Sequence, residues 1–294
     1  MSTATTQSVT LSWWNSSLSP KGGFRTKAHL EEAKAVILYL IKSQKVDFLA
    51  IGEVSETYSQ VIEDLLFESN YEYEPCLYPS GKSKFNHGYI YNSEKISIVD
   101  REILKFKENN RSYRLGHAIT LRTIYSEVPV LLIVSHWPSN LYENKVIKNK
   151  HGINLKRYID DLRSNYFEES HIILMGDYNL DPFEECLTDY LLATRDRSLV
   201  IKKPELFYNP YWRSLGLSEC SQFCGSYYYK SGNNTRWHLF DQIMFSAPFI
   251  KEYEWRLLEE GKIIGHQFLV EMITDHKKKF DHLPVIAKLE KINV

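Results

Sequence analysis

The sequence is poor in the features that define several classes of protein. Four cysteines in 294 residues do not supply a disulfide framework, and the first residues lack the basic and apolar segments of a secretion signal. The longest apolar stretch, Ala35 to Ile41, is too short to span a bilayer. With 13 glycines and 10 prolines, the chain is not collagen-like or of low complexity. These absences predict a reduced, cytoplasmic protein without membrane insertion.

A dominant charge of one sign is also missing. Lys and Arg total 36 and Asp and Glu total 37, so the net charge is -1. This balance supplies no overall field that would draw the chain onto DNA or an anionic membrane. A partner that carries phosphate would therefore have to be recognised locally. Because 43% of the residues are hydrophobic, the chain is too apolar to be disordered.

The arrangement of the apolar residues predicts the fold class. No internal repeat, charge block or flexible linker divides the sequence, which predicts a single domain over residues 1–294. Helical spacing predicts helices near 30–41, 58–66 and 155–166. Short apolar segments predict strands near 9–14, 48–51, 88–91, 96–104, 117–123, 130–135, 171–176, 226–229, 239–245 and 284–289. This mixture favours an α/β fold of packed mixed sheets flanked by helices.

Several of these strands contain or end in a polar residue that stays in phase with the buried face. Side chains alternate along a strand, so residues two apart share one face. The polar residues found in this way are Asn15, Glu53, His136, Asp177, Asn179 and Asp241. A buried carboxylate or amide without a partner costs on the order of a few kcal/mol. We therefore expect these groups to meet one another, or a cation, at one end of the sheets.

The same residues predict a type of chemistry. Only oxygen donors are offered by the acidic and amide members, Glu53, Asp177, Asn179, Asp241 and Asp281. Such hard donors select Mg²⁺ or Mn²⁺ over zinc. His136 and His282 fall among them, and a histidine beside a carboxylate can hold or transfer a proton near neutral pH. Carboxylates, imidazoles and a hard cation are what the hydrolysis of a phosphate ester needs.

Six short motifs occur in one order along the chain. They are Ser12-Trp-Trp-Asn15, Ile51-Gly-Glu53, Ser135-His-Trp-Pro138, Met175-Gly-Asp-Tyr-Asn179, Phe240-Asp-Gln-Ile243 and Asp281-His-Leu-Pro-Val285. Together they resemble the endonuclease/exonuclease/phosphatase superfamily, which has the deoxyribonuclease I-like fold. The resemblance implies a four-layer α/β sandwich with two mixed sheets. It also implies hydrolysis of phosphodiester or phosphomonoester bonds with a divalent metal, Mg²⁺ or in its place Mn²⁺.

The resemblance assigns roles to residues that match the family's motifs. Glu53 is the expected principal Mg²⁺ ligand, with Asn15 and Asp281 beside it. Asp177 and Asn179 match the G-D-x-N pair that positions the nucleophilic water and the scissile phosphate.

The two histidines of the motifs also receive roles. His282 corresponds to the histidine that contacts the phosphate and helps to activate water, oriented by Asp241, and His136 to a second phosphate-contacting residue. The family pattern adds Arg114 and Ser226 as candidate substrate contacts. Position alone adds Trp137, which follows His136 and otherwise reads as a packing group, and Lys277, which belongs to the lysine run that precedes Asp281.

Two departures from the family pattern concern the last motif and His136. Phe280 stands where relatives commonly have Ser, and residues 275–276 form a second Asp-His pair. Asp281-His282 is favoured because an apolar strand follows it, whereas the upstream pair runs into three lysines. The carboxylate that usually partners the His136 position has no clear counterpart, and His87 in that region does not replace it chemically.

Taken singly, the same residues have simpler interpretations. Asn15 can be a turn residue, Glu53 a first-turn acid of the next helix, and His136 an ordinary core histidine. Independent turns do not explain six in-phase polar groups in one order, so the catalytic interpretation is favoured. The basic run from Lys145 to His151, together with Lys156 and Arg157, is interpreted as a solvated helix face.

The leading hypothesis is a Mg²⁺-dependent nuclease that cleaves DNA or RNA with a metal-assisted water. One alternative is a phosphatase or phosphodiesterase that acts on a small molecule or lipid head group, favoured by the lack of overall positive charge. An alternative of another class is a non-catalytic binding module on the same scaffold. The sequence predicts no particular protein partner.

Overall fold

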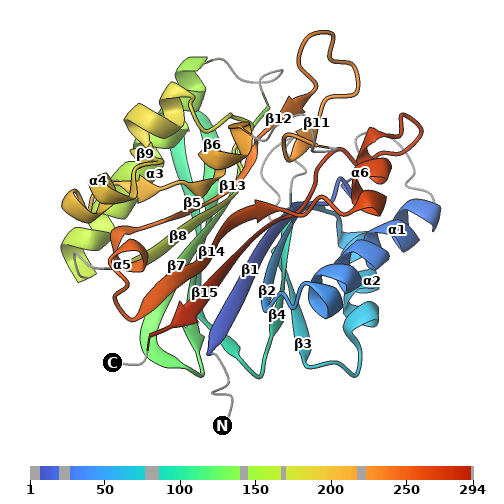
Figure 1. Cartoon of the computed structure of the whole chain (residues 1–294), viewed down its shortest axis with the longest axis horizontal. Coiled ribbons are helices and arrows are strands. Elements are labelled where there is room, and N and C mark those ends of the chain that lie inside the picture. Colours follow the sequence, from blue (N-terminus) through green and yellow to red (C-terminus); the bar gives the residue numbers. More distant parts are fainter. Residues whose placement is uncertain are drawn as a thin grey trace.

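The computed structural model describes residues 7–19, 27–76, 86–139, 145–166, 170–216 and 223–292, so the first six residues, on which the expectation about a secretion signal rests, lie outside it. Two large sheets dominate the fold (Figure 1). The first contains, in spatial order, β14 (Trp255–Ile263), β15 (Val285–Lys291), β1 (Ser8–Asn15), β2 (Phe48–Val54), β4 (Asn86–Asn92) and β3 (Tyr71–Cys76). The second contains β5 (Ile96–Glu108), β6 (Arg111–Thr123), β7 (Ser126–His136), β8 (His171–Asp177), β13 (Asp241–Phe245), β10 (Phe207–Tyr208) and β9 (Ala193–Thr194). A separate pair is formed by β11 (Tyr227–Tyr228) and β12 (Trp237–His238).

Helices cover the outer face of each sheet. The first sheet packs against α1 (Lys27–Leu38), which continues into η1 (Tyr39–Ser43), and against α2 (Glu56–Leu66) and α6 (Gln267–Thr274). The second packs against α3 (Lys145–Tyr166) and η2 (Cys186–Tyr190). Three shorter elements, α4 (Arg197–Lys202), η3 (Pro210–Gly216) and α5 (Ala247–Ile250), complete the list. Figure 1 shows the two helical groups on opposite sides of the paired sheets, which confirms the predicted four-layer α/β sandwich.

Strand alternation separates the apolar residues into distinct cores. In β1, Trp13 enters the core between the two sheets, where it joins Met175 of β8 and Val285 of β15. Its neighbour Trp14 points the other way and packs in the core beneath the helices of the first sheet. Both tryptophans are completely buried. Neighbouring side chains thus serve different layers because successive Cβ atoms point to opposite faces of a strand.

Strand register brings the polar strand ends to one end of the sandwich. In the first sheet β1 runs parallel to β2, and Asn15 pairs with Gly52. In the second sheet β7 runs parallel to β8, and His136 pairs with Asp177. Asp177 in turn lies opposite Asp241 on the antiparallel strand β13. The predicted meeting of these groups at one end of the sheets is therefore confirmed.

Gly176 permits the close approach of β7 and β8 beside Asp177. Its φ of 150° is one that other residues rarely adopt, and an added Cβ would collide with the carbonyl oxygen of Ser135. Glycine at this position lets the two strands meet where both end in polar residues.

The predicted elements are present, and several others were missed. The ten strands and three helices expected from periodicity correspond to observed elements. Strands β3 and β14 and helix α6 were not predicted, since their apolar residues show no clear spacing of two or cover only two turns. No helix in the part of the chain that the structure describes is long and apolar enough to cross a membrane.

One prediction about helix α3 was wrong. The basic run was expected to form a solvated face, but Lys148, His151 and Lys156 are buried. The aliphatic stems of lysines can line apolar surface while the ammonium finds a polar partner. For Lys148 that partner is the carbonyl oxygen of Asn179, at 3.0 Å.

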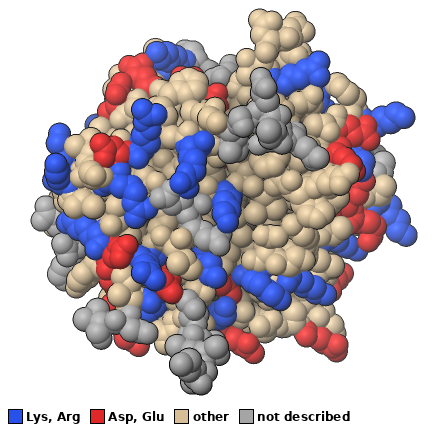
Figure 2. Space-filling view, in the orientation of Figure 1, with Lys and Arg blue, Asp and Glu red and all other residues tan. Residues whose placement is uncertain are grey.

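Charges of both signs are mixed on the surface. Figure 2 shows Lys and Arg side chains scattered over the visible face, with Asp and Glu side chains among them. This distribution fits the net charge of -1 and leaves recognition of an anion to local groups.

Candidate active site

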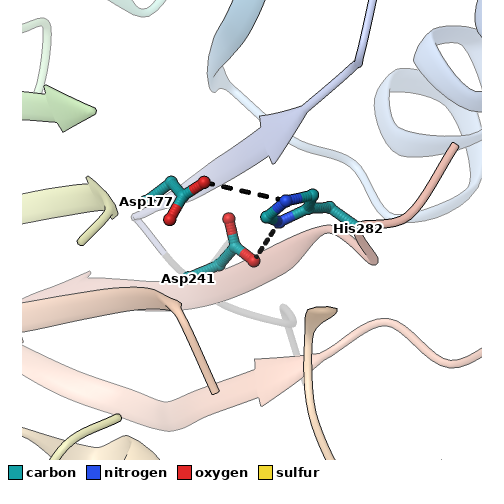
Figure 3. Close-up of side chains that lie close together, drawn as sticks. All are labelled: Asp177, Asp241 and His282. Atoms are coloured by element: carbon teal, nitrogen blue, oxygen red, sulfur yellow. Dashed lines mark hydrogen bonds and ion pairs between the residues drawn. The ribbon is translucent and has the colours of Figure 1, made fainter. Parts of the chain in front are cut away.

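Asp241 and His282 form a buried hydrogen-bonded pair at the polar end of the sheets (Figure 3). Nδ1 of His282 lies 2.7 Å from Oδ2 of Asp241, and Nε2 lies 3.7 Å from Oδ2 of Asp177. The other oxygen of Asp241 accepts a 2.7 Å hydrogen bond from Nε1 of Trp13. Both carboxylate oxygens of Asp241 are thus engaged, which fixes the imidazole with Nε2 directed at Asp177.

Asn15 links the two carboxylate-bearing parts of the site. Its side-chain nitrogen donates to Oδ2 of Asp177 at 3.1 Å and lies 3.4 Å from Nε2 of His282. The amide oxygen of Asn15 accepts from the backbone nitrogen of Ser17 at 3.2 Å. The end of β1 therefore continues directly into the site, as the strand phase predicts.

His136 also lies beside Asp177, and Glu53 lies beside His136. Nε2 of His136 lies 3.9 Å from Oε1 of Glu53 and 3.7 Å from Oδ2 of Asp177. Glu53 has a φ of 57°, and the register between β2 and β4 shifts between Gly52 and Val54. A β-bulge at this point redirects the carboxylate. Glu53 is therefore not a first-turn acid of α2, which begins at Glu56.

Asp281 is held at the edge of the site. Its Oδ1 accepts a 2.8 Å hydrogen bond from Oγ of Ser17 and lies 3.9 Å from Nε2 of His282. By contrast, the upstream Asp275 caps the turn that contains Lys277, and His276 is exposed. Of the two Asp-His pairs, only residues 281–282 lie beside Asp177 within the described residues.

The turn after β8 is fixed by several hydrogen bonds. The backbone nitrogen of Asn179 donates to Oδ1 of Asp177 at 2.8 Å, and its side-chain amide donates to the carbonyl of Trp137 at 2.9 Å. Asn179 has a φ of 51°, a left-handed conformation that asparagine tolerates better than most residues. With Lys148 bound to its carbonyl, Asn179 holds the Asp177 carboxylate in place.

The surroundings of the site raise the pKa values of Asp177 and His282, so both groups hold a proton to higher pH than usual. Burial raises the pKa of Asp177 to about 7, the nearby Asp241 carboxylate adds to the effect, and His282 opposes it. For His282, burial lowers the pKa, but the carboxylates of Asp241 and Asp177 outweigh burial and raise it to about 10. The carboxylates of the site therefore outnumber the imidazolium of His282 at neutral pH.

Comparison with known proteins agrees with this geometry. A profile of the Endonuclease/Exonuclease/phosphatase family matches residues 18–285. The chain belongs to this family. Family members are metal-dependent phosphoesterases, which confirms the predicted enzyme class. No curated protein matches the sequence.

Solved structures share the fold of the endonuclease/exonuclease/phosphatase family at low sequence identity. A Bacteroides thetaiotaomicron mannosyl-6-phosphatase has a TM-score of 0.66 at 14% identity, covering 96% of this chain and 99% of the phosphatase. ANGEL2, a 2',3'-cyclic phosphatase in complex with adenosine-2',3'-vanadate, scores 0.65 at 15% identity over 97% of this chain and 96% of its own. D. rerio TDP2 complexed with a single-strand DNA product has a TM-score of 0.63 at 15% identity, covering 96% of this chain and 98% of TDP2.

The residues present fit the divalent metal that the endonuclease/exonuclease/phosphatase family uses. Glu53 and Asp281 offer carboxylate oxygens beside the two histidines that contact Asp177, Asn15 offers its amide oxygen at the end of β1, and burial raises the pKa of Asp177 itself. When bound, a divalent cation neutralises phosphoryl oxygens and the leaving oxygen. Asp177, Asp241 and His282 also offer ligand atoms within 4.8 Å of one another. Within that trio Asp241 and His282 are hydrogen-bonded to each other.

Two candidate substrate contacts are supporting residues instead. Ser226 is completely buried, and its hydroxyl accepts the backbone N–H of Asp241 at 3.0 Å. Trp137 is 1% exposed and donates to the carbonyl of Leu115 at 2.9 Å, so it packs in the core instead of lining a groove. Each was placed near the site correctly, but sequence position does not reveal which way a side chain faces.

The other two candidates are Arg114 and Lys277. Arg114 acts electrostatically on the buried groups Cys76, His87 and His117. Lys277 is exposed on the turn that begins at Asp275. Their contact with a substrate remains a prediction.

A second histidine cluster lies behind His136 between the sheets. Nδ1 of His117 is 2.7 Å from Sγ of Cys76 and 2.6 Å from the hydroxyl of Tyr89. The ring of His87 is 4.8 Å from that of His117 and 6.2 Å from that of His136. Burial, reinforced by the positive charge of Arg114, lowers the pKa of His117 to about 3, and burial also lowers that of His87. These histidines are therefore neutral at physiological pH.

The sequence interpretation missed an aromatic group beside His282. Tyr227 bridges to His282 in a short antiparallel pairing, and the two rings are 4.8 Å apart. Burial raises the pKa of Tyr227, and the negative charges of Asp281, Asp177 and Glu53 add to the effect. The aromatic run Tyr227–Tyr229 was a visible signal, but its place depends on a hairpin whose strands have only two residues each.

Proposed function

We propose that this chain is a Mg²⁺-dependent phosphodiesterase that hydrolyses nucleic acid with water as the nucleophile. The observation that carries the choice of substrate is a stack of three partly exposed aromatic rings beside His282. Phosphoester hydrolysis itself follows from the family, whereas Mg²⁺ and nucleic acid are the proposed refinements.

The aromatic stack consists of Tyr227, Phe240 and His238. The rings of Tyr227 and Phe240 are 5.1 Å apart at 18°, and those of Phe240 and His238 are 4.9 Å apart at 20°. Asp181 holds His238 through a 3.1 Å contact with Nδ1 and accepts the N–H of Leu239 at 2.7 Å. Partly exposed, nearly parallel rings next to a phosphate-handling histidine suit a planar base.

In the proposed chemistry, Asp177 accepts a proton and His282 donates a hydrogen bond. A carboxyl group with a pKa of about 7 can accept a proton from water at neutral pH. The imidazolium of His282, with a pKa of about 10, can donate a hydrogen bond from Nε2 to a phosphoryl oxygen. Asp241 keeps that nitrogen directed at Asp177, and His136 offers a second donor next to Glu53.

Two of the similar structures support a nucleotide-bearing substrate. TDP2 was solved with a single-strand DNA product and ANGEL2 with adenosine-2',3'-vanadate. Oxygen donors at Asn15, Glu53 and Asp281 support Mg²⁺, with Mn²⁺ as a substitute, because hard donors favour these ions.

A substrate panel tests the proposal. Single- and double-stranded DNA, RNA, a sugar phosphate and bis(p-nitrophenyl) phosphate are incubated with Mg²⁺, with Mn²⁺ and with EDTA. We expect Mg²⁺-dependent cleavage of nucleic acid that Asp177→Ala and His282→Ala abolish. Tyr227→Leu and Phe240→Leu should raise KM for nucleic acid about 10-fold, as expected for the loss of a stacked base. Phe67→Leu is the matched control because Phe67, which directly follows α2, is 79% exposed.

The panel also identifies the alternative. A sugar-phosphate phosphatase is favoured by the mixed surface charge and by the fold shared with the mannosyl-6-phosphatase. Release of phosphate from the sugar without any cleavage of nucleic acid would establish that function and refute the nuclease.

A further inference from the structure

Lys230 makes an unusual set of contacts in the β11–β12 hairpin. Its Nζ donates to the main-chain carbonyls of Asp275 at 2.9 Å, Lys278 at 2.8 Å and Phe280 at 2.8 Å. An ammonium group has three donor hydrogens and no acceptor. The three carbonyls therefore use its full capacity, which leaves no donor for a substrate phosphate.

The carbonyls belong to the segment that leads into the catalytic pair. Residues 275–280 directly precede Asp281 and His282. Phe280 anchors the end of this segment, since its buried ring stacks on Trp14 with centroids 6.1 Å apart. The carbonyl oxygen of Asp275 accepts a second bond, from the backbone nitrogen of Lys278 at 3.1 Å.

The same hairpin holds the main chain on the other side of the pair. The backbone nitrogen of Tyr228 donates to the carbonyl of Asp281 at 2.8 Å. The backbone nitrogen of Leu283 donates to the carbonyl of Ser226 at 2.6 Å. Main-chain hydrogen bonds thus fix residues 281–283 to the hairpin, and the Lys230 ammonium fixes the segment that precedes them.

We propose that Lys230 is a positioning residue that fixes the segment 275–280 and so sets the position of His282 and Asp281. The inference rests on phosphoester hydrolysis at this site and not on nucleic acid as the substrate. Without the ammonium, three carbonyls lose a charged donor and the segment relaxes. A displacement of about 1 Å at a catalytic group can cost about 100-fold in rate.

The chemistry of lysine explains why other cations do not replace it. An ammonium is compact and directs its three N–H bonds outward like a tripod, whereas the guanidinium of arginine is planar and larger. Lys230→Arg should therefore be as defective as Lys230→Met. A small ammonium ion from solution should instead restore a variant that leaves space, Lys230→Ala.

The kinetic test compares Lys230→Met and Lys230→Ala with Lys202→Met, which removes an exposed lysine from α4. With Mg²⁺ and bis(p-nitrophenyl) phosphate, or the phosphoester that the wild type hydrolyses best, kcat should fall about 10- to 100-fold with KM within about twofold. Methylammonium should restore kcat of Lys230→Ala in a saturable way, and tetramethylammonium at equal ionic strength should not. An unchanged kcat would refute positioning, and a rise in KM alone would show a substrate contact instead.

Hydrogen exchange provides a readout that does not depend on activity. In Lys230→Met the amides of residues 275–283 should exchange faster than in the wild type, while those of β7 and β8 should not change. If the wild type hydrolyses no phosphoester, the proposed function fails, but this measurement still decides the role of Lys230. Unchanged exchange in residues 275–283 would overturn the proposal.

Discussion

Two buried histidine clusters lie within the same sandwich and titrate in opposite directions. His282 is paired with Asp241 at 2.7 Å, and its pKa rises to about 10 despite burial. His117 contacts a thiol and a phenol, and burial lowers its pKa to about 3. The comparison shows that a hydrogen-bonded carboxylate outweighs the cost of desolvation, whereas neutral partners do not.

Removing that carboxylate should have the largest effect. Asp241→Asn leaves His282 without its charged partner and able to adopt the wrong ring tautomer, so kcat should fall about 10³- to 10⁴-fold. Steady-state hydrolysis with Mg²⁺ measures the change. Asp161→Asn, at an exposed position of α3, is the matched control. A loss of less than about tenfold would show that the pairing is not what separates the two clusters.

Metal should stabilise the protein more at higher pH. The folded pKa of Asp177, about 7, lies above its ordinary value of 3.8, so its contribution to stability is present below pH 3.8 and is lost as the pH rises to about 7. A bound cation favours the charged carboxylate and offsets this loss. The rise in Tm on adding Mg²⁺ should therefore grow between pH 4 and 7 by on the order of 5 °C.

Thermal melts with Mg²⁺ and with EDTA test this expectation. Asp177→Asn should flatten the EDTA profile across the same pH interval. A metal-induced shift in Tm that stays constant from pH 4 to 7 would contradict the excess of negative charge inferred at the site.

The histidines of the second cluster should make stability depend on pH with the opposite sign to Asp177, so that stability falls as the pH is lowered. Because the folded pKa of His117 is about 3, the contribution of the neutral side chain to stability is complete above pH 6.5 and is lost as the pH falls toward 3. Each such histidine costs about 1.4 kcal/mol of unfolding free energy per unit of pH in that interval. His87→Leu removes one of them and should raise stability by about 1–2 kcal/mol at pH 7.

Urea denaturation at pH 7 and pH 5 measures both effects. The gain from His87→Leu should be larger at pH 5, where the wild type also carries the cost of keeping His87 neutral. Equal gains at the two pH values would show that folding does not lower the pKa of His87, and a smaller gain at pH 5 would show that folding raises it, as it does for His282.

Tyr89→Phe should have the smallest effect. The change removes a hydroxyl 2.6 Å from Nδ1 of His117 while Cys76 stays at 2.7 Å. Stability should fall by about 1 kcal/mol, with kcat within about twofold of the wild type. A much larger loss of activity would assign the second cluster a catalytic role and remove the contrast with Asp241 and His282.

Strand phase was sufficient to predict where the catalytic groups gather. Asn15, Glu53, His136, Asp177 and Asp241 were each predicted to belong to a buried face near one end of the sheets, because alternation is a local property of the chain. Which of these residues meet depends in addition on which strands are neighbours. The structure pairs Asn15 with Gly52 and His136 with Asp177. Their individual catalytic roles stay proposals.

The supporting contacts were beyond reach from the sequence. Lys230 follows three tyrosines in what reads as an exposed turn, and its acceptors are main-chain carbonyls about 50 residues away, which no side-chain pattern reveals. Lys148 and His151 occupy a basic stretch whose buried face becomes defined only when η2 packs against α3. Such contacts depend on tertiary packing and leave little periodic trace.

The pairing of β1 with β15 joins two strands that lie far apart in the sequence. Ser8 lies opposite Glu290 and Trp13 opposite Val285, so Asn15 and the support for Asp241 sit on a strand whose partner is synthesised long after it. A nascent chain that ends before residue 280 contains most of the acidic groups but neither His282 nor the strand that completes the first sheet. Such long-range pairing forms late in folding. The site at this end of the sheets is therefore incomplete until β15 has been synthesised.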